Sequence, residues 1–202
     1  MTPAGSAVDP RIERTRSVVV DATATLLARE GFERITIDAI AEQSGVARST
    51  IYRHWPDRAD LLAQGFAVVC SVEHTPDHGT LTKDLRHKGS MLAKGLTEDA
   101  WGRMLPSLVG ASAHDEDLER ALLRFNADRR GDALELIQRS VDRGEVDAGA
   151  DIAAALERFI GPFFLRHLMT HEPIDDVFVE RQVAALCGDL GVVYEPPAST
   201  GS

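Results

Sequence analysis

The stretch IDAIAEQSGVARSTIYRHW, residues 37–55, contains two short helical patterns joined at a glycine. In the first pattern, aliphatic residues recur from Ile37 at the i, i+3 and i+4 positions that share one face of a helix. Thr36 precedes this pattern, and its hydroxyl can accept a free backbone N–H of the first helical turn. Gly45 can adopt the positive φ that a tight turn after a helix needs. Ile51 gives the second pattern a core residue, so we predict two helices that pack around a turn at Gly45.

The second predicted helix, residues 47–55, is rich in hydrogen-bond donors for its length. Its polar and charged side chains are Arg48, Ser49, Thr50, Tyr52, Arg53 and His54. The spacing of Ala41, Gly45 and Ile51 is what a helix-turn-helix requires if its second helix is to enter the DNA major groove. In the groove Arg can pair bidentately with guanine, while Ser, Thr and Tyr can reach bases or phosphates. The stretch therefore predicts a DNA-binding helix-turn-helix.

A longer segment, GFERITIDAIAEQSGVARSTIYRHWPDRADLL (residues 31–62), closely resembles the DNA-binding domain of TetR-family transcriptional regulators. The matching positions are Gly31-Phe32, Thr36, Ile40-Ala41, Gly45-Val46, Thr50-Ile51-Tyr52, His54 and Trp55. The resemblance implies an all-α protein, with an N-terminal three-helix DNA-binding domain followed by a larger helical domain for ligand binding and dimerisation. It further implies a homodimer that binds double-stranded DNA at a palindromic operator and is released by a small-molecule effector.

The resemblance also assigns roles to individual residues. Bases or nearby phosphates would be contacted by Arg48, Ser49, Thr50 and Tyr52. The DNA backbone would be held by Thr36, Arg53, His54 and Arg58. We expect Arg48→Ala to lower affinity and change base preference, and Arg58→Ala to weaken binding to all sequences alike. Asp38 departs from relatives that carry a basic side chain at this position, and it could accept from a cytosine amine or act as a helix-start charge.

Composition indicates a globular protein without targeting segments. The chain has 202 residues, of which 44% are hydrophobic. No apolar run reaches the roughly 20 residues that a membrane helix needs, and the N-terminus lacks the apolar segment of a signal peptide. We therefore expect a cytoplasmic protein that has no contact with a membrane. The two cysteines, Cys70 and Cys187, are too few for a disulfide scaffold and are expected to be thiols.

The charge distribution fits a protein with two functional parts. The net charge is −10, whereas residues 1–60 carry eight Arg against nine Asp and Glu, a net charge of −1. A general polyanion binder should be basic throughout. Here Arg48, Arg53 and Arg58 gather the positive charge locally, and the acidic remainder would suppress nonspecific binding to DNA. We also expect the affinity for the operator to depend strongly on salt concentration.

The patterns divide the chain into four parts. We predict a disordered arm at residues 1–10, the helix-turn-helix domain at 11–56, the ligand-binding and dimerisation domain at 57–190, and a flexible tail at 191–202. The first helix should bury a stripe of Ile12, Val19 and Leu26, and Phe32 should fill the small core beside it. Later helices are predicted at residues 57–72, 81–96, 99–113, 115–144, 151–169 and 175–190, and no strand pattern is present.

Two groups of residues in the larger domain are candidates for further sites. The family resemblance implies an effector cavity, for which the candidates are Trp101, Met104, Phe125, Phe159, Phe163 and His167. For any single one of these residues, an ordinary core position is the favoured interpretation. The last two long helices carry apolar faces suited to a four-helix dimer interface, for which the candidates are Phe164, Leu168, Val179, Val183 and Leu186.

Other classes of protein receive less support from the sequence. A helical enzyme would need a nucleophile–base pair, a phosphate-binding glycine loop or an HExxH motif, and none supports one, so we predict no catalytic residues and no cofactor. Cys70, His74 and His78 have the spacing of a metal-ligand face, but Pro76 would interrupt that helix, so we expect a polar loop and no metal. The remaining alternative is a helical sensor or adaptor that does not bind DNA, which the donor-rich helix argues against.

Overall fold

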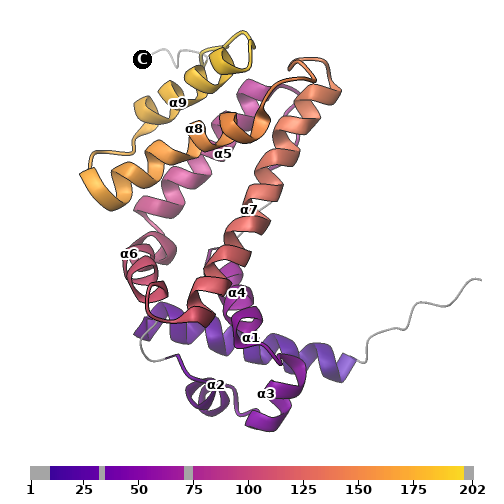
Figure 1. Ribbon diagram of the computed structural model, residues 1–202, viewed down its shortest axis with the longest axis vertical. Helices are drawn as coiled ribbons and strands as arrows, with labels where there is room; N and C mark the ends of the chain where they lie inside the picture. The colour runs from indigo at the N-terminus through magenta and orange to yellow at the C-terminus, as the bar shows by residue number, and fades with distance from the viewer. Residues whose placement is uncertain (1–9, 32–34, 71–74, 198–202) are drawn as a thin grey trace, which may run out of the picture. The chain divides into compact units, whose positions relative to one another are not determined.

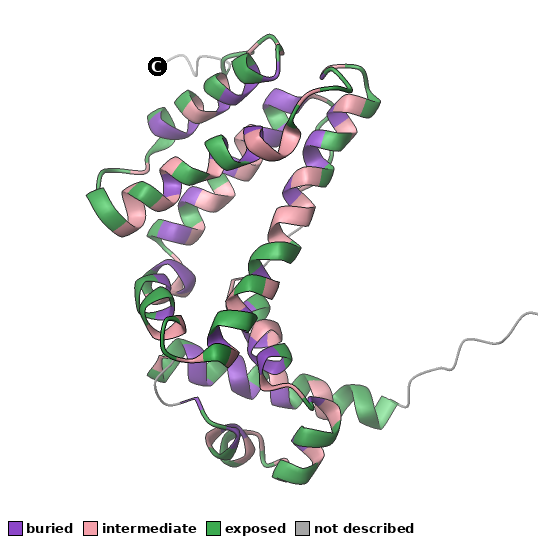
Figure 2. Ribbon diagram, in the orientation of Figure 1, coloured by how far each residue is buried: buried purple, intermediate pink, exposed green. Residues whose placement is uncertain are grey.

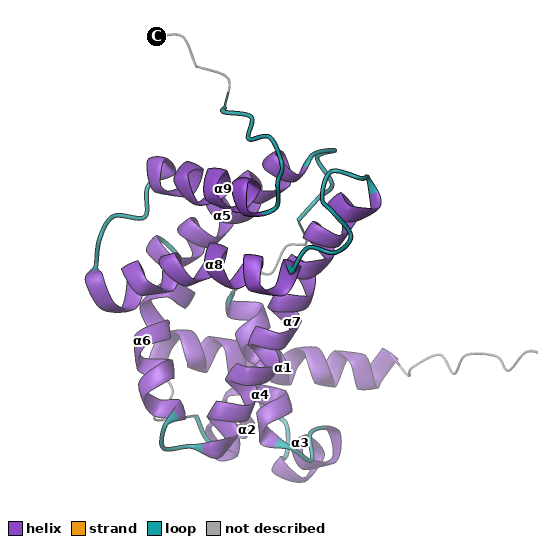
Figure 3. Ribbon diagram, turned by 45° about the horizontal axis from the view of Figure 1, so that its top comes forward, coloured by secondary structure: helices purple, strands orange, loops and turns teal. Residues whose placement is uncertain are grey.

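The computed structural model describes residues 10–31, 35–70 and 75–197, and these residues form helices without any strand (Figures 1 and 3). The expectation of an all-α protein is therefore confirmed for the described residues. The helices are α1 (Pro10–Glu30), α2 (Ile37–Ser44), α3 (Arg48–His54), α4 (Arg58–Val69), α5 (Leu81–Thr97), α6 (Ala100–Ser112), α7 (Glu116–Asp142), α8 (Ile152–Leu165), the π-helical turn η1 (Arg166–Thr170) and α9 (Asp176–Asp189). Within the described ranges no helix is both long enough and apolar enough to span a membrane.

The chain forms two compact units that do not coincide with the predicted boundary after residue 56. The N-terminal unit comprises Met1–Val72 and Met104–Phe125, and the C-terminal unit comprises Glu73–Arg103 and Asn126–Ser202. Helix α4 therefore belongs with the helix-turn-helix, together with most of α6 and the beginning of α7. The sequence pattern showed where helices begin and end, but it did not show which helices pack together.

The core of the N-terminal unit is built where α1 packs against α2 and α4. Val19 and Leu26 are buried as predicted, whereas Ile12 is exposed, because the first turns of α1 extend beyond the helices that cover its later part. Gly65 of α4 lies so close to α1 that an added Cβ would be 2.7 Å from Thr23 Cγ2. Phe32 lies outside the described residues.

The C-terminal unit is organised around α9, which packs against α5 and α8. The rings of Phe159 and Phe163 are 5.6 Å apart, and Phe163 meets Phe178 of α9 edge-to-face at 4.9 Å. At Gly89 of α5, an added Cβ would lie 2.9 Å from Cγ1 of Val179. Figure 2 shows the buried faces of these helices alternating with exposed faces along each helix. The apolar faces of these helices therefore pack against one another within the same chain.

Candidate nucleic-acid interface

Helix α2 is fixed by hydrogen bonds at both of its ends, the second of which begins the turn into α3. The hydroxyl of Thr36 accepts the Ala39 amide at 3.1 Å and so caps α2, as the sequence predicts. At the other end Gly45 has a φ of 69°, in the left-handed region, and its amide donates to the carbonyl of Ala41 at 2.9 Å. The hydroxyl of Ser44 also accepts the amide of Val46 at 3.2 Å. These bonds set the direction in which the chain enters α3.

Helix α3 is anchored by its apolar residues and presents its donors outward. Ile51 is completely buried and Trp55, just beyond the helix end, is nearly so. The guanidinium of Arg16 on α1 lies 4.9 Å from the centre of the Trp55 ring, a cation–π contact that holds α3 against α1. The predicted recognition helix is therefore held at its buried face, which leaves the opposite face available to DNA.

The predicted DNA-contact residues lie together because most of them share this one short helix. On α3 four of them are exposed: Arg48, Ser49, Tyr52 and Arg53. Thr50 and His54 are half-buried, and the His54 ring meets Trp55 edge-to-face at 5.9 Å. Thr36 is exposed at the start of α2, although its hydroxyl also serves as the helix cap. The local arrangement is that of a donor-rich surface on α3.

Asp38 and Arg48 form an ion pair across the helix-turn-helix, which the sequence pattern did not predict. A guanidinium nitrogen of Arg48 donates to Oδ1 of Asp38, and both side chains are exposed. This hydrogen bond, followed by the charge of the Asp38 carboxylate, raises the pKa of Arg48 above its ordinary value. The first turn of α2 and the first residue of α3 thus meet at the surface, and Arg48, a candidate base-reading side chain, is paired with Asp38.

Arg58 is held inside the N-terminal unit by its own contacts, and its role as a phosphate contact stays a prediction. Its Nη1 donates to Asp115 at 3.1 Å and to Asp117 at 3.3 Å, and its Nη2 donates to the carbonyl of Ile35 at 2.7 Å. Only 21% of the Arg58 side chain is exposed. A guanidinium with two carboxylates and a carbonyl as partners would have to break these contacts to reach a phosphate. The partners are 57 and 59 residues away in the sequence, so no local pattern could have revealed them.

The candidate effector residues have contacts typical of a protein core. Phe125 of α7 meets the Phe66 ring edge-to-face at 6.3 Å in the N-terminal unit, to which the half-buried Met104 also belongs. In the C-terminal unit Trp101 is buried, and Nε2 of His167 lies 2.7 Å from the carbonyl oxygen of Gly102.

Phe159 and Phe163 pack in the aromatic cluster with Phe178. The assignment of all six candidate residues to an effector cavity stays a prediction.

Three of the five candidate dimer residues face the interior of their own chain. Val179, Val183 and Leu186 are at most 2% exposed in the single chain. Their assignment to a dimer interface stays a prediction, although α5 and α8 of the same chain already cover the buried stripe of α9. The other two candidates, Phe164 and Leu168, are half-buried and can still contribute to an interface.

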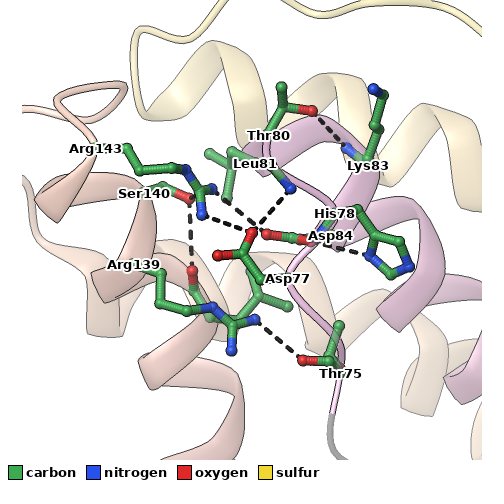
Figure 4. Close-up of polar contacts among 12 residues, drawn as sticks. Thr75, Asp77, His78, Thr80, Leu81, Lys83, Asp84, Arg139, Ser140 and Arg143 are labelled. Atoms are coloured by element: carbon green, nitrogen blue, oxygen red, sulfur yellow. Dashed lines mark hydrogen bonds and ion pairs between the residues drawn. The ribbon is translucent and has the colours of Figure 1, made fainter.

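The segment considered as a metal site instead takes part in an ionic cluster around a buried carboxylate (Figure 4). Oδ1 of Asp84 accepts the backbone amide of His78 at 2.8 Å and lies 3.0 Å from His78 Nδ1. Arg143, which directly follows the end of α7, contacts the second Asp84 oxygen at 3.5 Å and Asp77 at 3.0 Å. Cys70 ends α4, His74 lies outside the described residues, and the described part of the chain contains no cluster of three or more metal-ligating side chains.

The fold and the donor-rich α3 define a helix-turn-helix DNA-binding protein. Residues 19–64 match the family model described as bacterial regulatory proteins of the tetR family, and residues 75–186 match the model of a tetracyclin repressor-like C-terminal domain. The chain belongs to the TetR family of transcriptional regulators, whose members are not enzymes.

Individual relatives extend this match over most of the chain. The HTH-type transcriptional regulator YdeS of Bacillus subtilis (strain 168) is 32% identical over 176 residues, which cover 86% of this chain and 88% of YdeS. The DNA-binding transcriptional repressor TetR of Mycobacteroides abscessus is 31% identical over 174 residues, covering 84% of this chain and 90% of that repressor. The crystal structure of the TetR family transcription regulator SCO0332 superposes with a TM-score of 0.72 at 29% identity, over 90% of this chain and 100% of that one.

Proposed function

We propose that this protein is a dimeric transcriptional repressor that binds a palindromic operator and is released by a small molecule. The observation that carries the proposal is helix α3, which is fixed by Ile51 and Trp55 and presents Arg48, Ser49, Tyr52 and Arg53 outward. One such helix reads only a few base pairs, whereas two helices related by a two-fold axis read both halves of a palindrome. Repression is supported by the relative from Mycobacteroides abscessus, which is a DNA-binding repressor.

Within this proposal the residues of the helix-turn-helix divide by role. Arg48, Ser49, Thr50 and Tyr52 read bases or the adjacent phosphates, because they occupy the first turns of α3. Thr36, Arg53 and His54 hold the DNA backbone. Arg58 supports the helix-turn-helix from within. The effector would bind in the C-terminal unit, whose residues 75–186 match the tetracyclin repressor-like domain.

The experiment that tests the proposal is selection of genomic DNA fragments by the purified protein at two salt concentrations, read by sequencing. Enrichment of one palindromic motif at both concentrations is the expected result. Enrichment without a motif that vanishes at higher salt would show electrostatic binding only and would overturn the proposal. Compounds related to the products of genes beside the motif should then be tested for release of the bound fragment.

A further inference from the structure

The contacts of Arg58 connect two places that are far apart in the sequence. This arginine is the first residue of α4, and its guanidinium meets Asp115 and Asp117 at the start of α7. The same guanidinium donates to the carbonyl of Ile35 at 2.7 Å. Ile35 immediately precedes Thr36, the cap of α2, so one side chain links the start of α7 to the backbone that leads into the helix-turn-helix.

A second set of ion pairs runs in the opposite direction between the same two helices. Asp57 caps α4 and also pairs with Arg124 at 2.8 Å and Arg120 at 3.3 Å, both on α7. Arg124 reaches Asp60 at 2.5 Å as well. Asp115 in turn caps α7 by accepting the Asp117 and Leu118 amides. Each helix therefore offers its acidic N-cap to an arginine of the other helix, and the reciprocal arrangement fixes the two N-termini against each other.

The ion pairs around Arg58 are partly buried, so they can stabilise the fold more than exposed pairs do. The side chains of Arg58, Asp115 and Asp117 are 21%, 35% and 31% exposed, so water and salt screen their attraction less than that of a surface pair. Burial alone would raise the pKa of Asp115, but the Leu118 amide and the Arg58 guanidinium outweigh it and leave this pKa below its ordinary value. Asp115 is therefore a carboxylate at neutral pH and is available to Arg58.

We propose that Asp115 and Asp117 are positioning residues for operator binding, which act through Arg58 to fix the backbone at the entrance to α2. The inference rests on the proposed function, because it assigns a task to residues that do not touch DNA. The direction of α2 and α3 depends on where the chain enters α2, and a displacement of about 1 Å at a recognition surface is costly. The competing interpretation is that Arg58 leaves the aspartates and binds a phosphate in the complex.

The test compares operator affinity among variants that change the charge but little of the shape. Asp115→Asn with Asp117→Asn removes both carboxylates, while the amide oxygen introduced at position 115 can still cap α7. Arg58→Gln removes the guanidinium, and Arg58→Lys retains the charge with a different geometry. The matched control is Glu116→Gln with Glu119→Gln, which removes two exposed charges from the same turn of α7 that make no ion pair among the described residues. Affinity for the selected operator is measured by fluorescence anisotropy well below the melting temperature, at several salt concentrations.

The positioning role predicts a defined pattern of results. The double Asn variant and Arg58→Gln should each bind about tenfold more weakly, and all three substitutions together should add little, because residues of one network are not additive. The dependence of affinity on salt should stay that of the wild type in Arg58→Gln, and Arg58→Lys should recover part of the affinity. The control that combines Glu116→Gln with Glu119→Gln should not weaken binding.

Three outcomes would overturn the inference in distinguishable ways. A salt slope lowered by about 0.9 in Arg58→Gln, with unchanged or tighter binding of the double Asn variant, would identify Arg58 as a phosphate contact. A lowered melting temperature with wild-type affinity would show a structural role only. If the wild-type protein selects no operator, the proposed function fails together with this inference, whereas a wild type that binds beside unaffected variants removes the inference alone. Should Arg58→Gln not fold, Arg58→Lys and the isosteric double Asn variant still decide between these outcomes.

Discussion

At the scale of single residues, the ion pair between Asp38 and Arg48 forms in the protein without DNA. It engages a side chain that we predict to determine base specificity. The pair is exposed and lies at the start of the recognition helix, so the side chain predicted to read guanine is occupied before DNA arrives. Binding to a base would require Arg48 to exchange a carboxylate for the base edge. We therefore expect Asp38 to influence recognition through Arg48, without contacting DNA itself.

We predict that Asp38→Asn tightens operator binding a few-fold, because it releases Arg48 and removes a negative charge beside the predicted recognition helix. The same substitution in an Arg48→Ala background should gain less, since no arginine is released there. Both series are measured by anisotropy titration against the selected operator and against variants of each base pair. Weaker binding of Asp38→Asn, limited to operators with one particular cytosine, would contradict this mechanism and show that Asp38 reads that base directly.

At the scale of helices, α9 shows why an apolar stripe does not reveal what will cover it. Val179, Val183 and Leu186 are spaced as a core-facing stripe, and the structure covers them with α5 and α8 of the same chain. We propose that a second copy would bind to other faces of the last helices of the chain. The exposed apolar residues there are Leu165, Met169 and Val177, beside the half-buried Phe164 and Leu168.

We predict that Leu165→Asp combined with Val177→Asp converts a dimer into monomers, because it places charges on apolar surface that a partner would have to bury. Leu165 and Val177 are 54% and 68% exposed, so the folded monomer should tolerate both changes. The measurement is size-exclusion chromatography with light scattering. Leu123→Asp is the control, since Leu123 is 61% exposed but lies on α7. A dimer that survives the double substitution would place the interface on another surface.

At the scale of the whole molecule, hydrogen-bonded carboxylates should make the free energy of unfolding depend on pH. The pKa of Asp57 is lowered by the Ala59 amide and Arg124, and that of Asp77 by the Gly79 amide with the nearby arginines. Burial raises the pKa of Glu180, but Arg86 and Tyr194 outweigh it and leave the pKa low. Asp115 behaves in the same way, so both units contain carboxylates that favour the charged form when folded.

We predict that the free energy of unfolding is highest above the pKa of an unfolded carboxyl group, about 4, and falls as the pH drops below that value. The sign follows because a depressed folded-state pKa means that the unfolded chain binds protons first. Urea denaturation at a series of pH values between neutral and about pH 3 measures this dependence. Glu180→Gln should flatten the profile at its acid end while lowering stability at neutral pH, and a profile identical to the wild type would remove Glu180 from the explanation.

The sequence by itself determined the helices, the turn and the exposed candidate recognition residues. Thr36, Gly45 and Ile51 act through contacts with near neighbours, so their roles could be derived from spacing alone. Only the tertiary structure decided the partners of Arg58, the covering of α9 and the grouping of residues 104–125 with the helix-turn-helix. The physical reason is that periodicity records which face of a helix is apolar or charged. The identity of the opposing surface depends on contacts between residues that are distant in the chain.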